Sequence, residues 1–109
     1  MRDRTARALQ DMLDSASTAM RYRDEAPGEW LDDGLRVDAI VRRVELVGEA
    51  ASRVPVDDRD QFPSIEWREI IGIRQHLIHG YDRIDFDILD GVLRHNLPRL
   101  VQRIEELLA

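Results

Sequence analysis

The stretch VDAIVRRVELVGEAASRV, residues 37–54, gives the clearest indication of the architecture. Its apolar side chains recur every three or four positions, which places them on one face of an α-helix. The members of this apolar face are Val37, Ile40, Val41, Val44, Val47, Ala51 and Val54. Asp32 or Asp33 can cap the start of this helix, and Pro55 ends it. A helix of this kind needs other apolar helices to cover its buried face.

A first helix is predicted over residues 3–24, before the break at Pro27 and Gly28. Its inward positions, at three- and four-residue steps, are Ala6, Leu9, Met12, Leu13, Ala16, Ala19 and Met20. After the central helix, the stretch VDDRDQFP at residues 56–63 is the longest polar connection. We expect this stretch to form a flexible loop.

Two more helices are predicted in the C-terminal half. Ser64 is expected to cap the third helix, and Gly80 to end it in the left-handed conformation. The inward positions of the third helix are Trp67, Ile70, Ile71, Arg74, Leu77, Ile78 and Tyr81. The fourth helix begins near Asp85 and is broken near Pro98. Because strand signals are weak, the sequence predicts one all-α domain over residues 1–109, an up-and-down four-helix bundle with a broken or additional short C-terminal helix.

Composition narrows the function classes. The chain has no cysteine, which excludes disulfides, thiol catalysis and Cys-based zinc sites. No apolar run approaches the roughly 18 to 20 residues of a membrane span, and the start MRDRTARALQ lacks the apolar core of a signal peptide, so we expect a cytoplasmic protein with no membrane partner. The net charge of −6 argues against a broad nucleic-acid-binding surface, but it permits a local arginine-lined cleft.

Three polar residues stand close together at the end of the third helix: Arg74, His79 and Tyr81. An arginine in the middle of an apolar face is costly unless it is paired, reaches water or faces a cleft. Arg74 therefore has either a structural role, in a salt bridge to an acidic residue of a neighbouring helix, or a functional one. No metal site is expected, since His76 and His79 have no third ligand at an obvious spacing, and His95 is expected to cap or to lie exposed.

Residues 67–108 read WREIIGIRQHLIHGYDRIDFDILDGVLRHNLPRLVQRIEELL, and residues 47–54 read VGEAASRV. Together they closely resemble the HepT-like branch of the HEPN superfamily, small all-helical toxins encoded beside MNT-type minimal nucleotidyltransferases. The defining element of that branch is an arginine, four arbitrary residues, a histidine, one residue and a tyrosine. Arg74, His79 and Tyr81 stand at these positions. Gln75 replaces the usual asparagine after the arginine, and Gly80 replaces a common aspartate.

The resemblance implies a metal-independent endoribonuclease without cofactors, acting as a homodimer in which the Arg–His pairs of two subunits meet at a shared cleft. His79 would then be the general acid and base, since imidazole titrates near neutral pH. Arg74 would bind the phosphate oxygens bidentately. Gln75 would orient Arg74 or a phosphate oxygen, and Tyr81 would line the cleft.

The resemblance also implies regulation within a toxin–antitoxin system. The partner nucleotidyltransferase, acting as antitoxin, would transfer AMP to Tyr81, and the added phosphodiester would block RNA by charge and bulk. A second reading is a noncatalytic helical module that docks the nucleotidyltransferase, with Arg74 and His79 holding a nucleotide or a structural ion pair; Gln75 and Gly80 favour it. A third is a plain structural bundle, which leaves the motif unexplained.

Overall fold

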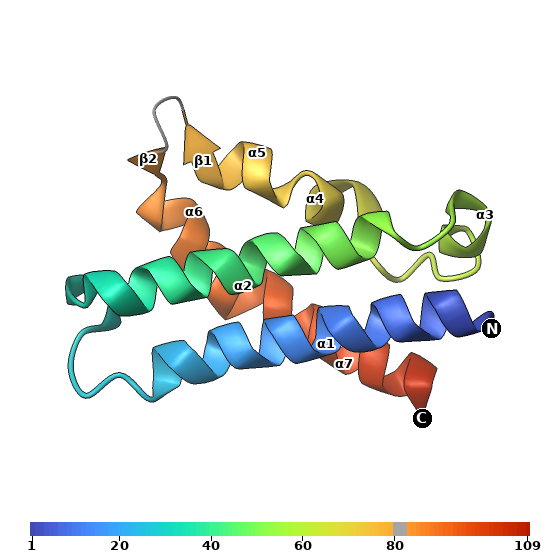
Figure 1. Cartoon of the computed structure of the whole chain (residues 1–109), viewed down its shortest axis with the longest axis horizontal. Helices are drawn as coiled ribbons and strands as arrows, with labels where there is room; N and C mark the ends of the chain where they lie inside the picture. The colour runs from blue at the N-terminus through green and yellow to red at the C-terminus, as the bar shows by residue number, and fades with distance from the viewer. Residues whose placement is uncertain (80–82) are drawn as a thin grey trace.

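The two longest helices form an antiparallel pair. The computed structural model describes residues 1–79 and 83–109. Helices α1 (Asp3–Asp24) and α2 (Gly34–Ser52) lie side by side along their length (Figure 1). The predicted bounds of the first helix are thus confirmed. At the start of α2, the carboxylate of Asp33 accepts a hydrogen bond from the backbone N–H of Arg36 at 3.1 Å, so Asp33 is the cap. The short 3-10 helix η1 (Trp30–Asp32) precedes it and buries Trp30.

The hydrophobic core lies between this pair and the C-terminal helices. Its fully buried side chains come from residues far apart in the sequence and include Leu9, Met12, Ile40, Val44, Leu77, Leu89, Leu93 and Ile104. Full burial of one such side chain stabilises the fold by about 1.5 to 3 kcal/mol. The apolar face predicted for residues 37–54 is buried at all seven positions, which confirms the sequence-based assignment.

The polar stretch after α2 is not the flexible loop that the sequence predicted. It contains the short helix α3 (Val56–Arg59), and Asp58 within it is only 5% exposed. Asp58 accepts a hydrogen bond from the Thr5 hydroxyl and lies 3.4 Å from Arg2 Nε. A buried carboxylate needs such partners, and here they come from α1 and the residue before it. The stretch is therefore tied to the start of the chain.

The predicted third helix is two short helices, α4 (Trp67–Ile71) and α5 (Ile73–Leu77), separated at Gly72. Ser64 does not cap it, because α4 begins at Trp67 and has no side-chain cap. The indole N–H of Trp67 instead donates to the carbonyl oxygens of Arg59 and Phe62, each at 3.1 Å. The Trp67 indole thereby fastens the preceding connection to the start of α4.

A close backbone contact joins this segment to α2. A Cβ atom added at Gly48 would lie 2.9 Å from the carbonyl oxygen of Ile70 and 3.2 Å from the Ile73 side chain. Only glycine leaves room for the two backbones to approach this closely. Gly48 therefore sets how α4 and α5 lie against α2, which they cover as seen in Figure 1.

Helix α5 ends at Leu77 and gives way to a small antiparallel sheet, which the sequence did not predict. Strand β1 (Ile78–His79) pairs with β2 (Arg83–Ile84), with Ile78 opposite Ile84 and His79 opposite Arg83. Gly80, predicted as a left-handed stop, lies outside the described residues; the helix ends before it, since Ile78 is already extended at φ −110° and ψ 115°. β-Branched side chains favour this conformation.

The last part of the chain is helical from Phe86 onward: α6 (Phe86–Gly91), the π-helical turn η3 (Val92–Asn96) and α7 (Leu97–Leu108). The break predicted near Pro98 is this wide turn. Proline lacks an N–H and clashes with the carbonyl four residues earlier, and a π turn absorbs both effects. Helix α7 packs on α1, so the all-α bundle is confirmed. No described helix is long and apolar enough to span a membrane.

Candidate active site

Arg74 does not lie on the apolar face where the sequence placed it. The buried side chains of this segment are Ile70, Ile73 and Leu77, which belong to the hydrophobic core, whereas the Arg74 side chain is 66% exposed. The buried positions 70, 73 and 77 keep the spacing of one helix face, and Arg74 lies at the edge of that face, from which its long side chain reaches solvent. The cost of a buried cation is thereby avoided.

The guanidinium of Arg74 has a partner on α2. Its Nε lies 3.2 Å from Oε2 of Glu45, whose side chain is 17% exposed. A guanidinium carries five N–H donors in a planar fork, so the contact through Nε leaves other donors available for a ligand. The salt bridge that the structural reading of Arg74 predicted is therefore present, and the side chain remains accessible to a ligand from solvent.

Arg74 and Gln75 line a shallow cleft of about 290 Å³ between α2 and the α4–α5 segment. Two carboxylates, Glu45 and Glu49, lie on its α2 side, and Glu49 pairs with Arg42 at 3.2 Å. The cleft thus brings together two of the predicted site residues, Arg74 and Gln75. His79 does not line it.

His79 lies on β1, with its side chain 58% exposed. Its Nε2 is 3.3 Å from Oδ2 of Asp85, the residue that joins β2 to α6. The other oxygen of Asp85 accepts the Ile88 N–H at 3.1 Å and caps α6. The pKa of the Asp85 carboxyl is lowered, mainly because the Ile88 N–H bonds to the ionised form; partial burial opposes this, and His79 adds to the lowering.

The described residues thus form two polar centres within one chain. Arg74 and Gln75 lie against α2, whereas His79 lies against the start of α6, and among residues 1–79 and 83–109 the arginine and the histidine share no partner. Within a single subunit, these contacts therefore do not bring Arg74 and His79 together in one cleft. Tyr81, the fourth predicted residue, lies outside the described residues.

Sequence reasoning did not identify Glu45 or Asp85 as site residues. Asp85 carried a local signal, because it was predicted at the start of the fourth helix, and its second oxygen reaches His79. Glu45 carried none, since its partner lies in another helix, and a carboxylate beside an apolar face resembles any solvated position. Long-range pairing of this kind depends on how α5 packs against α2.

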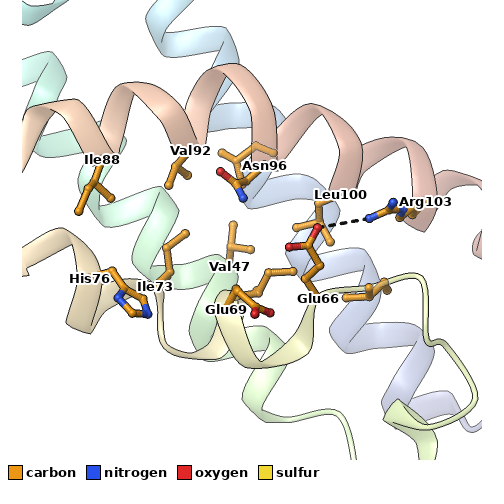
Figure 2. A pocket seen from close by; sticks show the side chains of 13 residues that line it. Val47, Glu66, Glu69, Ile73, His76, Ile88, Val92, Asn96, Leu100 and Arg103 are labelled. Carbon is orange, nitrogen blue, oxygen red and sulfur yellow. Dashed lines mark ion pairs between the residues drawn. The ribbon is translucent and has the colours of Figure 1, made fainter.

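A more apolar groove lies on another side of the bundle. Figure 2 shows it between the α4–α5 segment and the helices from α6 to α7, with Ile73, Val92 and Leu100 among the side chains that line it. Its volume is about 220 Å³, and Glu66 and Arg103 pair across one end at 3.8 Å. Neither Arg74 nor His79 lines this groove, so it is separate from both polar centres.

The two remaining histidines are exposed. His76 borders the apolar groove, and His95 lies on η3, where its carbonyl oxygen accepts from Arg99 Nε at 3.2 Å. The expectation that His95 caps or lies exposed is confirmed. Within the described part of the chain, no three side chains of His, Asp or Glu are grouped so that they could hold a metal ion.

The bundle thus presents an exposed arginine and an exposed histidine five residues apart. A family model described as "Ribonuclease HepT-like" matches residues 12–107. The chain belongs to this HepT-like family, as its sequence predicted.

Curated relatives agree with this assignment. The chain is 31% identical over 98 residues to "Putative RNase MJ1380" of Methanocaldococcus jannaschii, an alignment that covers 89% of this chain and 90% of the relative. It is 30% identical over 106 residues to "Probable ribonuclease HepT" of Thermococcus cleftensis, covering 93% and 96%. It is also 30% identical over 80 residues to "Putative RNase TTE0752" of Caldanaerobacter subterraneus, covering 73% and 71%. No solved structure matches the chain significantly.

Proposed function

We propose that the chain is a metal-independent endoribonuclease, the toxin of a toxin–antitoxin system, with Arg74 and His79 as its catalytic residues. Membership of the HepT-like ribonuclease family supports the reaction class. The observation that carries the assignment of residues is their exposure: within a well-packed bundle, Arg74 is 66% and His79 58% exposed. Both side chains can therefore reach an RNA strand from solvent.

The proposed chemistry uses one phosphodiester and no added reactant. A neutral imidazole of His79 takes the proton of the 2′-hydroxyl, and the freed oxygen forms a bond to phosphorus. The bond from phosphorus to the 5′-oxygen breaks, and a protonated imidazole gives that oxygen its proton. The products are a 2′,3′-cyclic phosphate and a 5′-hydroxyl. Arg74 binds the nonbridging oxygens, whose negative charge grows in the transition state, and Gln75 beside it orients the guanidinium or the phosphate.

Two subunits supply the site in this proposal. One His79 cannot easily act as base on one side of the phosphate and as acid on the other. A two-fold homodimer provides a second copy. It also offers a route by which Arg74 of one subunit and His79 of the other meet, which the contacts within one subunit do not provide.

Regulation follows from Tyr81 at the end of the motif. We propose that a minimal nucleotidyltransferase antitoxin transfers AMP to it: the phenolic oxygen attacks the α-phosphorus of ATP, a new P–O bond forms, the phenolic proton is released to solvent, and pyrophosphate leaves with its electron pair. The product is a bulky anion that would pair with Arg74 and exclude RNA.

Cleavage is tested with purified protein, RNA and EDTA, followed by analysis of the fragment ends. We expect 2′,3′-cyclic phosphate ends, and a loss of about 10² to 10⁴-fold in rate in the Arg74→Ala and His79→Ala variants. Arg94→Ala is the matched arginine control, since that side chain is also 66% exposed and pairs through Nε with a carboxylate, at 2.9 Å. His95→Ala is the histidine control. Cleavage that requires a divalent ion, or that survives in His79→Ala, would contradict the proposal.

The shared site is tested by mixing wild-type subunits with His79→Ala subunits. If one site needs His79 from both subunits, the mixed dimer is nearly as inactive as the His79→Ala homodimer, whereas independent sites would leave it about half of the wild-type activity. Light scattering gives the mass of the assembly. A monomer that cleaves RNA at full rate would exclude the two-subunit arrangement.

AMP transfer is tested with the nucleotidyltransferase and ATP, by intact mass and by loss of ribonuclease activity. Tyr81→Phe should accept no AMP and stay active. Tyr22→Phe is the control, because Tyr22 is the other tyrosine of the chain and packs partly buried against the core. AMP found on Tyr81→Phe would reject this acceptor.

One observation favours a second candidate function. The pair of Arg74 with Glu45 is the contact expected if the arginine has a structural role, as in a noncatalytic module that docks a nucleotidyltransferase or a nucleotide. In that case the protein binds the nucleotidyltransferase or a nucleotide, and no RNA cleavage above that of Arg74→Ala is detected. The cleavage experiment with EDTA therefore decides between the two functions.

A further inference from the structure

The two carboxylate oxygens of Asp85 contact different groups. Oδ1 accepts the backbone N–H of Ile88 at 3.1 Å and caps α6, whereas Oδ2 lies 3.3 Å from Nε2 of His79. The backbone N–H of Asp85 also donates to the carbonyl oxygen of Leu77 at 2.9 Å. The carboxylate is thus fixed to the helix that follows, and the backbone of Asp85 is fixed to Leu77, two residues before the histidine.

We propose that Asp85 is the positioning residue of His79: it accepts the Nε2–H of the imidazole and so leaves Nδ1 as the nitrogen that exchanges protons with RNA. The catalytic half of this statement rests on the proposed ribonuclease function. A neutral imidazole has one N–H and one lone pair, and the group bonded to the N–H decides which nitrogen is the base.

The geometry allows Asp85 to hold the ring still. Aspartate has a short side chain, and the bond from Ile88 fixes its orientation. On the other side, His79 is held in β1 by its pairing with Arg83. The lowered pKa of Asp85 keeps the carboxylate ionised at neutral pH, so it accepts a hydrogen bond and does not donate one.

The contact also joins the motif to a helix that carries none of the motif residues. His79 lies before residues 80–82, and Asp85 follows them at the start of α6. A carboxylate placed there orients the imidazole toward α6, and the unbonded ring nitrogen then lies on the side away from Asp85. This separation of the two ring nitrogens is what a general base needs, because one nitrogen must stay free for the substrate.

The decisive variant is Asp85→Asn. Asparagine caps a helix as well as aspartate does, so its oxygen should keep the Ile88 bond. Its NH₂ group then faces His79 as a donor, which forces Nε2 to accept and moves the ring proton to Nδ1. Asp85→Ser is a second variant, since serine also caps but its hydroxyl is too short to bridge both groups. Asp87→Asn removes a charge from the same helical turn and is the matched control.

The tautomer is read from the ¹⁵N chemical shifts of the His79 ring at alkaline pH, where imidazole is neutral. We expect the Nε2–H form in the wild type and in Asp87→Asn, and the Nδ1–H form in Asp85→Asn. With RNA, kcat of Asp85→Asn should fall about 10²-fold at little changed KM, and circular dichroism should report a folded protein.

The outcomes separate this inference from the proposed function. A wild-type ring in the Nδ1–H form, or an Asp85→Asn ring unchanged from wild type, overturns the positioning role even if His79→Ala is inactive. The expected tautomers together with an unchanged rate in His79→Ala would uphold the contact with Asp85 and reject the ribonuclease site. A fall in kcat in Asp87→Asn equal to that in Asp85→Asn would also overturn the positioning role of Asp85, because the loss would then come from removing a negative charge at the start of α6.

Discussion

The α1–α2 pair and the segment from α4 to the start of α6 are built on different principles. The pair consists of helices of 22 and 19 residues that bury side chains such as Leu9 and Ile40 completely. The segment consists of helices of five residues and strands of two, and it exposes Arg74 and His79. Long regular helices provide stability, whereas the broken segment directs polar side chains outward. Stability and proposed chemistry therefore lie in separate regions that meet at Gly48.

The largest effect should come from removing a core side chain of the pair. Leu9→Ala leaves a cavity at a fully buried position and should lower the free energy of unfolding by about 2 to 5 kcal/mol. Leu35→Ala, at a leucine of α2 that is 86% exposed, should change it by no more than about 0.5 kcal/mol. Urea unfolding measures both. Equal effects would mean that the pair does not hold the stabilising core.

The next effect concerns the contact that joins the two regions. In Gly48→Ala the added Cβ would lie 2.9 Å from the Ile70 carbonyl oxygen. Because this oxygen belongs to the backbone, relieving the clash requires a backbone shift, and the free energy of unfolding should fall by about 1 to 3 kcal/mol. Gly91→Ala is the control: its Cβ meets nothing within 4 Å and its φ is −61°, so alanine should stabilise α6 by about 0.5 to 1 kcal/mol.

Gly48→Ala should also change the site, because it moves the α4–α5 segment relative to Glu45. Ribonuclease activity should fall more than in Leu35→Ala when both are assayed well below their melting temperatures. Retained activity with lowered stability would show that the two regions are coupled in folding but not in function.

A smaller effect on stability is expected from Arg74→Ala. Its pair with Glu45 is exposed on the arginine side, but Glu45 is 17% exposed and loses its partner, so the loss should be about 1 kcal/mol. Arg94→Ala should cost less than about 0.5 kcal/mol, because Asp90 is 33% exposed. Thermal melting compares the two variants. A loss of several kcal/mol in Arg74→Ala would favour the structural role of the arginine over the catalytic one.

The smallest effect is a dependence on pH through Asp85. The pKa of this carboxyl is lower in the folded chain than its ordinary value of 3.8, so its contribution to stability is present above that value and is lost as the pH falls through the folded pKa. Between pH of about 5 and about 2, the stability advantage of the wild type over Asp85→Asn should therefore shrink. Melting curves across this range measure it. An advantage that grows on acidification would contradict the lowered pKa.

Much of the fold could be predicted from the residues. The inward positions of α2, the bounds of α1 and the start of α6 at Asp85 follow from local rules of helical periodicity and capping. The predicted third helix was only partly right, because Gly72 divides it and Ile78 adopts an extended conformation. The same periodicity placed Arg74 on the buried face, because position 74 borders that face and the pattern alone does not show that the side chain reaches solvent. The stretch after α2 was predicted as a flexible loop because the burial of Asp58 against Thr5 is a contact across 53 residues.

The sequence by itself determined the helical class, the family and the spacing of Arg74 and His79, because these depend on neighbours along the chain. Only the tertiary structure decided which carboxylates hold them: Glu45 reaches Arg74 across the contact at Gly48, and Asp85 reaches His79 across the small sheet. The physical reason is range. Periodicity and caps act within about one turn of helix, whereas an ion pair forms between whatever side chains the packing of the backbone brings within a few ångströms.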